Sequence, residues 1–423
     1  MSALLFEIHG MAKIGSVLEH VCLPHALIIC ISSLLFMICM IITIWYEPAN
    51  DGDIANTNAS NLTCSADMSS FIVAHFTDLH YGEDTGHDVR SKQIMEDILS
   101  AEGRVDLAVF GGDQVSGWMV TDNRLALQKW AESLSVAFQR KIKFATIFGN
   151  HDDQPYAGDP PGMLPWARYI LVCSCILLWV AVYRKGLPRF SKLMCVSTIA
   201  GCWITCVVYP STVMRQSFHS HERELYGGYS QTRKGAPGLH GSSNYYLPIT
   251  CNQSTFLLFF LDSGGGRIQQ AYTQRQLDWV LDVSLEFPGS LSMLFVHVPA
   301  LEYDQTFRDR GRHFKCWGSR LEDASSHAES EPDYVMHHFH AAGVKAVFVG
   351  HDHENSWCCV PKSHFWSQPA LCYGRHTGQG GYGTQSRGAR IIQVGFKQGG
   401  IYIDTWVRLE NKTKIEHGVL YQS

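Results

Sequence analysis

Five short apolar runs in this chain each end in polar residues, and this recurrence constrains the fold more than any other feature. The runs are "FIVAHFTDLH", "VDLAVFGGDQ", "KFATIFGNHD", "SMLFVHVPA" and "VKAVFVGHDH". Their length and their content of Val, Ile and Phe predict buried β-strands. The polar residues that the strands deliver at or near their ends are Asp78, His80, Asp113, Asn150, His151, His297, His351 and His353.

Helical patterns lie between these runs. They are found in "SKQIMEDILSAEG", "TDNRLALQKWAESLSVAFQR", "TQRQLDWVLDVSLEF" and "PDYVMHHFHAAG". The third opens with a capping box from Thr273 to Gln276, and the fourth has Pro near its start and Gly after its end. Alternating strands and helices predict β-α units and a largely parallel arrangement. Ligands of such sheets bind outside the carboxyl ends of the strands, where the polar residues emerge.

The residue types at these strand ends suit a metal site. Asp, Asn and His offer oxygen and imidazole donors that bind Zn, Mn or Fe, whereas a structural zinc site or an iron–sulfur cluster would use thiolates. Seven such donors exceed the needs of one metal, but two metals about 3.5–4 Å apart that share a carboxylate would use them all. A lone "DLH" or "GNHD" is more often a turn or a helix cap. Ordered repetition at five strand ends favours the metal site.

The motifs resemble a known family. "DLH", "GGDQ", "GNHD", "VHVP" and "GHDH" are similar to the five ordered motifs of the calcineurin-like metallophosphoesterases, over about residues 71–404. "LCYGRHTGQGGYG" and "RGARII" resemble the purple-acid-phosphatase-like branch of plants and fungi, some members of which are named probable inactive phosphatases. The resemblance implies an α/β fold, a two-sheet α/β/β/α sandwich, for residues 70–423.

The resemblance also implies roles for the matching residues. Asp78, His80 and His353 would hold one metal, Asn150, His297 and His351 the other, and Asp113 would bridge them. The nucleophile would be a metal-bound hydroxide, because coordination lowers the pKa of water from about 15.7 to about 7. His151 would donate a proton to the leaving group or bind a phosphate oxygen.

Three further residues are candidates for the site. Asp152 could orient the ring of His151, with a helix cap as the alternative. Arg375 and His376 lie in a Gly-rich stretch where backbone can approach a ligand and arginine can bind phosphate, so they are substrate-binding candidates. The alternative is a turn-rich loop that packs over the sheet.

Purple members of the resembled family bind ferric iron with a tyrosinate three residues after the bridging aspartate. That position here is Ser116, in "GGDQVSG". A hydroxyl cannot give the charge-transfer band, and His80 offers an imidazole to the same metal. We therefore expect two divalent or mixed-valence ions of Fe, Zn or Mn in a colourless protein.

Other histidines are not expected to be ligands. His75 is predicted to be a core or strand-face residue. His337, His338 and His340 lie on a predicted helix, where an i, i+3 pair could face a metal, but nothing supplies the remaining ligands. A solvated helix face is the preferred interpretation.

The N-terminal region predicts a membrane anchor. After a tail at residues 1–25, residues 26–46 form an apolar run of 21 residues without a formal charge, about the ~20 that a helix needs to cross a bilayer. The charges that flank this run place the N-terminus in the cytosol. The long, barely basic leader favours a signal anchor over a cleaved signal peptide. Residues 47–69 would be a linker, and the body would be lumenal or extracellular. The glycosylation sequons that this topology would expose are Asn58, Asn61, Asn252 and Asn411.

Six cysteines lie outside residues 1–46 and 163–212: Cys64, Cys251, Cys316, Cys358, Cys359 and Cys372. They could pair in an oxidising compartment, but the sequence does not reveal the partners.

An apolar insertion at about residues 163–212 departs from the family pattern. It contains "YILVCSCILLWVAVY" and "LMCVSTIAGCWITCVVY", which are short for membrane spans. A membrane hairpin with a basic cytosolic turn, an interfacial hairpin, buried helices and translated intron sequence are the interpretations left open.

The net charge of −5 offers no basic stripe, so nucleic acid is not an expected partner. We expect a two-metal hydrolase of phosphate monoesters, anchored to the membrane by its N-terminal segment. The alternatives are a phosphodiesterase, and a membrane-anchored glycoprotein with a catalytically poor metal site.

Overall fold

The structure is a computed structural model that describes residues 62–64, 70–154, 210–251, 254–323, 329–330, 332–363, 368–397 and 400–423. The chain divides into two compact units, and residues 56–161 with 211–423 form the one described below. The other, residues 1–55 with 162–210, lies almost entirely outside the described residues. The expected anchor, most of the apolar insertion and the sequons at Asn58, Asn61 and Asn252 also fall outside them. Within the described ranges, no helix is both long and apolar enough to cross a membrane.

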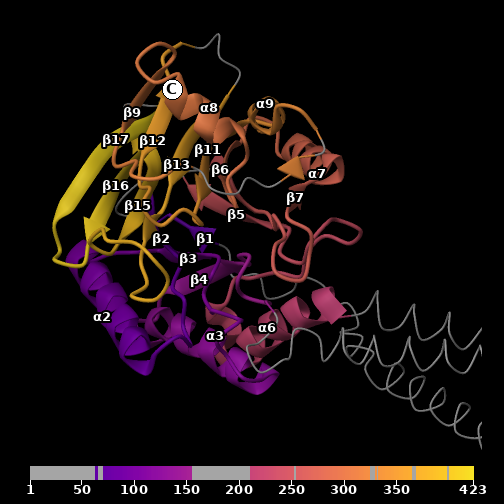
Figure 1. Ribbon diagram of the computed structural model, residues 1–423. Coiled ribbons are helices and arrows are strands. Elements are labelled where there is room, and N and C mark those ends of the chain that lie inside the picture. The colour runs from indigo at the N-terminus through magenta and orange to yellow at the C-terminus, as the bar shows by residue number, and fades with distance from the viewer. Residues whose placement is uncertain are drawn as a thin grey trace, which may run out of the picture. The chain divides into compact units, whose positions relative to one another are not determined.

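One mixed sheet of seven strands contains the first three expected strands (Figure 1). β2, β3 and β4 are parallel neighbours, while β15, β16 and β17 add an antiparallel meander beside β2. The sequence analysis did not place this meander. In spatial order the strands are β17 (Lys414–Gln422), β16 (Gly400–Leu409), β15 (Gly388–Lys397), β2 (Ser70–Thr77), β3 (Leu107–Gly111) and β4 (Lys143–Ile147), and β14 (Arg375–His376) also pairs with β2.

A second mixed sheet of eight strands contains the other two expected strands, β8 and β11. β6, β8, β11 and β13 are parallel, and antiparallel strands flank them. In spatial order the strands are β1 (Leu62–Thr63), β5 (Tyr245–Cys251), β6 (Ser254–Phe260), β8 (Leu291–Phe295), β11 (Val344–Val349), β13 (Ala370–Tyr373), β12 (Cys358–Pro361) and β9 (Phe314–Trp317). A separate pair joins β10 (Glu329–Ser330) to β7 (Ala271–Tyr272).

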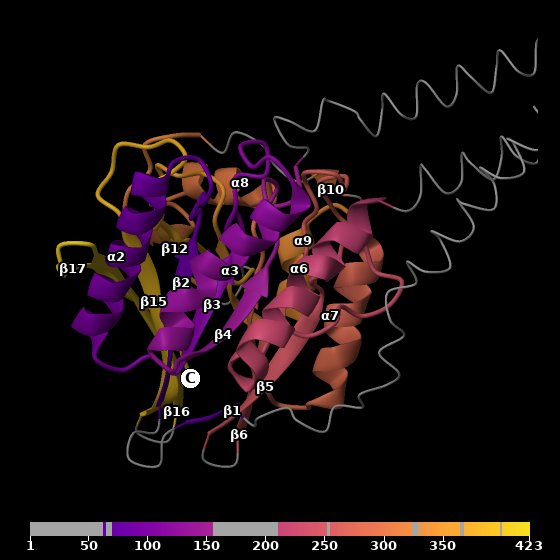
Figure 2. The same ribbon diagram turned by 90° about the horizontal axis from the view of Figure 1, so that it is seen from below.

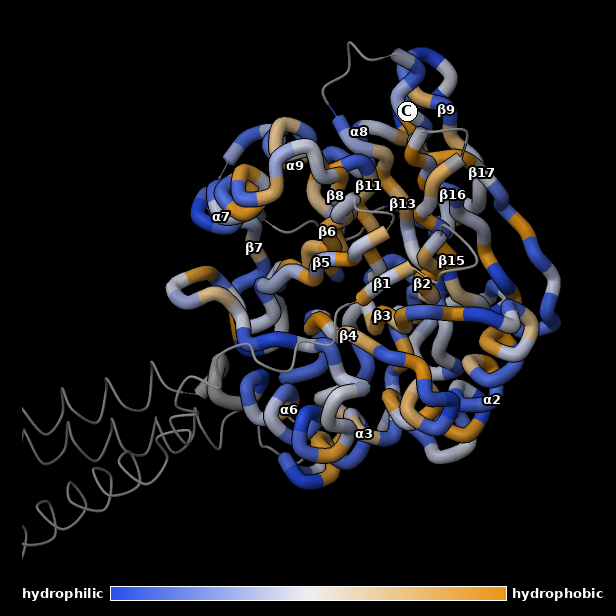
Figure 3. The backbone as a smooth tube through the Cα atoms, turned by 180° about the vertical axis from the view of Figure 1, so that it is seen from behind, coloured by the Kyte–Doolittle hydropathy of each residue, from blue (hydrophilic) through white to orange (hydrophobic). Residues whose placement is uncertain are grey.

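The two sheets pack face to face, with helices on both outer sides. Side chains such as Val73 and Val109 of one sheet meet Leu258 and Phe295 of the other in a shared core. Central strands are apolar on both faces and stand out as orange segments in Figure 3. Figure 2 shows the helices over the seven-stranded sheet: α2 (Thr85–Glu102), α3 (Asn123–Gln139) and α6 (Pro210–Tyr226), which is followed by η1 (Gly227–Tyr229). Those over the other sheet are α7 (Gln274–Glu286), α8 (Glu302–Arg308) and α9 (Val335–Ala341).

Local signals set the helix ends. Asp84 caps α2 by accepting the backbone N–H groups of Gly86 and His87. The capping box from Thr273 to Gln276 opens α7, as the sequence predicted. These caps satisfy N–H groups that have no partner within the helix.

All six cysteines singled out in the sequence form disulfides. The pairs are Cys64–Cys251, Cys316–Cys359 and Cys358–Cys372. Cys358 and Cys359 are neighbours on β12, so their side chains point to opposite faces of the sheet. One therefore bonds to β13 within the inter-sheet core and the other to β9 on the helix side.

Candidate metal centre

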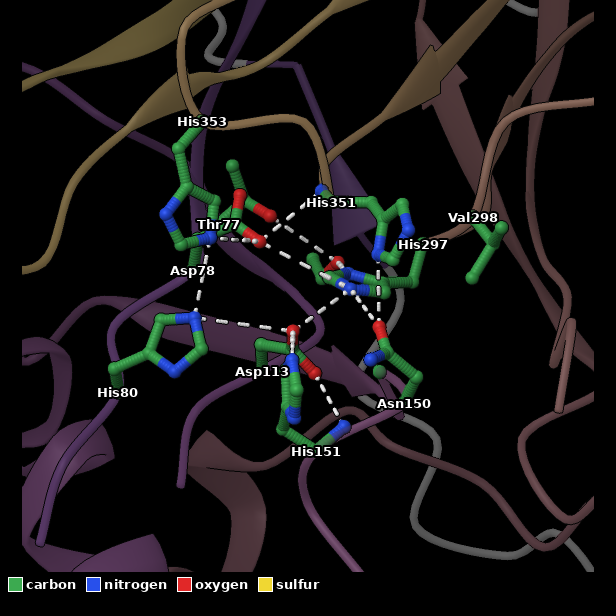
Figure 4. Close-up of polar contacts among 12 residues, drawn as sticks. Thr77, Asp78, His80, Asp113, Asn150, His151, His297, Val298, His351 and His353 are labelled. Carbon is green, nitrogen blue, oxygen red and sulfur yellow. Dashed lines mark hydrogen bonds and ion pairs between the residues drawn. The ribbon is translucent and has the colours of Figure 1, made fainter. Parts of the chain in front are cut away.

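The polar residues predicted at the strand ends converge on one site. They come from the loops that follow β2, β3, β4, β8 and β11, and Figure 4 shows them facing one another. Two clusters contain His, Asp or Glu atoms close enough to hold a metal ion, with the candidate ligand atoms of each cluster within 4.8 Å of one another. The first is Asp78, His80 and His353, and the second is Asp113, His297 and His351.

Asp113 lies between the two clusters. Its Oδ2 is 3.1 Å from Nε2 of His297 in one cluster and 3.8 Å from Nε2 of His80 in the other. This oxygen is buried and makes no hydrogen bond of good geometry, although Nε2 of His297 lies within ion-pair distance. A buried carboxylate costs free energy unless a cation lies beside it, and a metal ion would supply that cation. The donor set therefore fits two metal ions that share Asp113.

Asn150 completes the second cluster. Its Oδ1 is 2.8 Å from Nδ1 of His351 and 3.2 Å from Nε2 of His297. Nδ1 of His297 lies 2.8 Å from the carbonyl oxygen of Gly111, to which it can donate its proton. That hydrogen bond leaves Nε2 of His297 free to face the site.

The two imidazoles of the first cluster are held in the same way. Nδ1 of His353 lies 2.8 Å from the carbonyl oxygen of Tyr382, and Nδ1 of His80 lies 2.8 Å from Oγ of Ser116. The two Nε2 atoms approach to 3.2 Å. Each ring therefore turns the same nitrogen toward the site.

Four candidate ligands lie in the left-handed region of backbone space. The φ angles are 58° for Asp78, 52° for His80, 55° for Asp113 and 75° for His351. Such conformations cost about 1 kcal/mol or more for residues other than glycine, and they gather at functional sites. Position 112 requires glycine, because a Cβ there would come within 2.3 Å of Nδ1 of His297.

Burial and neighbouring charges set the protonation of the donors. Burial lowers the pKa of His80 and of His351 to about 3, so both rings are neutral. Burial opposes the ionisation of Asp78, but the hydrogen bond and charge of His353 lower its pKa below the usual range. Burial also opposes the charge on His297, yet Asp113 and Asp78 raise its pKa to about 10. A metal ion at Nε2 of His297 would have to displace that proton.

His151 lies at the edge of the cluster. Its side chain is 26% exposed, and its Nε2 is 3.8 Å from Oδ2 of Asp113. Nδ1 lies 2.9 Å from Oε1 of Gln154, an acceptor that the sequence analysis missed. When Nδ1 donates to this oxygen, the ring presents Nε2 toward the site.

Asp152 does not orient the ring of His151, contrary to the prediction. Its carboxylate is buried and accepts backbone N–H groups from Gly149, Val115 and Asp113. Burial and the charge of Asp113 raise the pKa of Asp152, and the N–H donors of Gly149 and Val115 lower it. Asp152 therefore joins the loops after β3 and β4 and is a structural residue.

Arg375 and His376, the predicted substrate-binding residues, are buried and are not among the described residues that line the pocket. Arg375 is 4% exposed and donates to the carbonyl oxygen of Ser386 and to Oγ of Ser356. His376 is also buried, and its ring centroid lies 3.9 Å from that of His353. Their contacts hold the loop beneath the first cluster.

A buried arginine supports the second cluster from behind. Arg215, on α6, pairs with Asp153 at 3.0 Å and with Asp262 at 2.6 Å, and all three side chains are fully buried. It also donates to the carbonyl oxygen of Gly149, next to Asn150. Asp153 precedes the apolar insertion and Arg215 follows it, so this pair joins the chain where it leaves and re-enters the described unit.

His75 lies in the core, as predicted. His75 is fully buried on β2 near the ring of Phe295, with neither ring nitrogen hydrogen-bonded. His337, His338 and His340 lie on α9. Within the part of the chain that the structure describes, none of them belongs to a cluster suited to a metal ion.

A pocket of about 670 Å³ opens over both clusters. Trp118 and Tyr382 form its aromatic walls: Trp118 lies 4.4 Å from the ring of His151, and Tyr382 stacks on His353 at 4.0 Å. Among the described residues, the lining is His80, Glu83, Trp118, Met119, Asn150, His151, His351, His353, Gly381 and Tyr382, with no Lys or Arg. Neither wall was predicted: no motif marks Trp118, and Tyr382 lies in the Gly-rich motif, which does not specify its role.

Residues 71–206 match the sequence profile of the family described as "Calcineurin-like phosphoesterase". The protein named "Probable inactive purple acid phosphatase 28" of Arabidopsis thaliana is 24% identical over 358 residues, which cover 79% of this chain and 76% of the relative. "Phosphatase DCR2" of Saccharomyces cerevisiae is 25% identical over 400 residues, which cover 85% of this chain and 57% of the relative. The solved structure of the purple acid phosphatase PPD1 from yellow lupin seeds aligns at 10% identity with a TM-score of 0.43, over 83% of this chain and 53% of that one.

Proposed function

Because this chain carries a calcineurin-like phosphoesterase domain and is a metal-dependent phosphoester hydrolase, we propose that it hydrolyses phosphate monoesters. The observation that carries the proposal is Asp113, whose buried Oδ2 lies between two clusters of candidate ligands. Two metal ions bound there would supply a nucleophile from water at neutral pH and offset the charge of the phosphate.

The side chains divide the work between binding and proton transfer. Asp78, His80 and His353 would hold one ion, Asn150, His297 and His351 would hold the other, and Asp113 would be shared. Nε2 of His151 faces the pocket beside Asp113 and donates a proton to the leaving oxygen. Gln154 keeps the proton of the ring on Nδ1 when Nε2 is deprotonated.

Two considerations favour monoesters over diesters. A monoester dianion carries more negative charge on its non-bridging oxygens than a diester does, so it makes fuller use of two cations. The relatives are named as phosphatases. The name of one includes the words "probable inactive", but the donor set found here supports an active site.

The pocket suits a flat or apolar leaving group. Trp118 and Tyr382 offer aromatic faces, and Met119 adds an exposed apolar side chain. Glu83 contributes a carboxylate, and no Lys or Arg occurs among the described lining residues. A leaving group with several phosphates is therefore disfavoured, because nothing in this lining besides the metal ions would offset its charge.

Turnover of p-nitrophenyl phosphate and of bis(p-nitrophenyl) phosphate by the metal-loaded full chain tests this proposal. We expect the monoester to be hydrolysed faster, a chelator to abolish the reaction, and Zn²⁺, Mn²⁺ or Fe²⁺ to restore it. Inositol hexakisphosphate should be a poor substrate. Faster turnover of the diester would instead indicate a phosphodiesterase, and no turnover of either ester by a chain with both metals bound would indicate a catalytically poor site.

We also propose that the catalytic unit lies in the lumen or outside the cell, anchored by residues 26–46. The three disulfides support this location, because such bonds persist in oxidising compartments. Asn411 is exposed in the turn before Thr413, where a glycan could be attached. Endoglycosidase treatment should increase the electrophoretic mobility of the membrane-expressed chain. Asn411→Gln should remove part of that shift, and an unchanged mobility of the wild-type chain would contradict the location.

A further inference from the structure

Nδ1 of His80 faces a side-chain hydroxyl, whereas Nδ1 of His297 and of His353 each face a backbone carbonyl. Nδ1 of His297 faces the carbonyl oxygen of Gly111, and Nδ1 of His353 faces that of Tyr382. Nδ1 of His80 faces Oγ of Ser116 at 2.8 Å. A carbonyl oxygen can only accept, so it sets the tautomer of the ring, whereas a hydroxyl can either donate or accept. A further partner of Ser116 must therefore determine whether its hydroxyl donates to Nδ1 of His80 or accepts from it.

Glu83 decides it. Oγ of Ser116 donates its proton to Oε1 of Glu83 over 2.7 Å, and a carboxylate can only accept. With its proton committed to Glu83, Oγ of Ser116 can only accept from Nδ1–H of His80. The lone pair of His80 is then on Nε2, which faces the first cluster 3.2 Å from Nε2 of His353.

The second oxygen of Glu83 reaches the other imidazole of the same cluster. Oε2 accepts the backbone N–H of Gly381 at 2.8 Å. Gly381 lies against both rings, because a Cβ added there would be 2.5 Å from Cε1 of His353 and 2.8 Å from Cδ2 of His80. Glu83 thus holds the loop that covers the two histidines as well as the hydroxyl that sets the tautomer of one of them.

We propose that Glu83 and Ser116 are positioning residues for the first metal ion, acting in series to keep Nε2 of His80 unprotonated and aimed at the metal. Ser116 is fully buried, and the side chain of Glu83 is 17% exposed, so the chain of hydrogen bonds is largely shielded from water. Outer partners of metal-binding histidines orient the ring and raise its basicity. The inference depends on the metal assignment in the proposed function.

The test compares the full-length wild-type chain with Ser116→Ala and Glu83→Gln. Ser116→Ala removes the acceptor of Nδ1–H. In Glu83→Gln the amide oxygen can accept from only one of Ser116 and Gly381. When it accepts from Gly381, the NH₂ group faces Oγ of Ser116, and the Ser116 hydroxyl then donates to Nδ1 of His80. Both changes shift the proton of His80 to Nε2. Ser133→Ala is the matched control, because Ser133 is also fully buried and its hydroxyl donates only to the carbonyl oxygen of Trp130 in α3.

Chelator competition should show that each test variant binds one of its two ions about 10–100-fold more weakly than the wild-type chain does. Long-range ¹H–¹⁵N spectra of the metal-free chain should show the His80 proton moving from Nδ1 toward Nε2. Wild-type affinity for both ions in both variants would overturn the inference, as would an equal loss in Ser133→Ala. Failure of the wild-type chain to bind two ions would instead overturn the proposed function.

Discussion

The backbone N–H of His151 donates to Oδ1 of Asp113 over 2.8 Å, so the proposed bridging carboxylate also holds the loop that carries the proposed proton donor. The two oxygens of Asp113 have separate tasks. Oδ1 fixes the position of His151, while Oδ2 faces the candidate ligands of both metal ions. Metal binding and loop position can therefore be separated by substitution.

Asp113→Asn should lose metal and activity while the fold is retained. An amide can keep its oxygen as the acceptor for His151 N–H, but it replaces the anionic bridging oxygen with a nitrogen that is not a ligand. Metal content by mass spectrometry and a thermal unfolding curve would check both parts. Two ions bound at wild-type occupancy would argue against the bridging role.

His151→Ala should retain both metal ions and lower kcat by about 10²–10⁴, the usual contribution of general acid catalysis. His337→Ala is a matched control, because His337 is an exposed residue of α9. Steady-state kinetics and metal analysis on the same preparations would decide. A wild-type rate in His151→Ala would show that the proton comes from elsewhere.

Arg215→Met should destabilise the fold by about 3–5 kcal/mol, because it leaves the buried carboxylates of Asp153 and Asp262 without their cation. Arg90→Met provides the comparison. Arg90 is 46% exposed and pairs with Glu410 at the surface, so its loss should change stability by about 1 kcal/mol or less. Denaturant unfolding of both variants measures the difference, and equal effects would contradict the role given to the buried pair.

Glu222→Gln should remove a loss of stability that the wild-type chain shows as the pH rises toward neutral. Burial raises the pKa of Glu222 in the folded state, although hydrogen bonds from Ser230, Thr146 and Trp130 work against it. The folded chain therefore keeps this proton where the unfolded chain has released it, and stability falls as the pH rises above the unfolded pKa. An amide has no such cost. Unfolding free energies from pH 4 to 8 should diverge toward neutral pH, and parallel curves would contradict the argument.

The metal-loaded protein should be active yet colourless. Ser116 occupies the position from which a tyrosinate would bind ferric iron, and its hydroxyl is bonded to His80 and Glu83 instead. Visible spectroscopy of the oxidised, metal-replete chain would check this. An intense purple band that disappears on reduction would refute the ligand assignment for His80.

The sequence predicted the candidate ligands well because each lies directly after an apolar strand, where a local pattern marks it. Gln154, Trp118 and Glu83 were missed because their roles depend on loop conformations that no local pattern encodes. Asp152 was misassigned for the same reason: adjacency to His151 suggested a contact, but the backbone turns its carboxylate toward the N–H groups of Gly149 and Val115.

Contacts between residues far apart in the sequence could not be predicted either. Arg215 and Asp153 are 62 positions apart, on either side of the apolar insertion, and nothing in the sequence connects them. The disulfide partners were equally hidden, although the strand register of β12 explains them once the sheet is known. The substrate-binding interpretation of Arg375 and His376 rested on a Gly-rich stretch. Such a stretch indicates close approach of the backbone without specifying what it approaches.

The pairing of Asp153 with Arg215 allows the length of the segment between them to vary. The cost of closing a loop rises by only about 0.6 kcal/mol for each doubling of its length, which is small beside the cost of breaking a buried ion pair. Segments of very different length could therefore be inserted between these two residues while the Asp153–Arg215 ion pair still forms. This junction therefore suits an engineered segment that replaces the insertion without changing the metal centre.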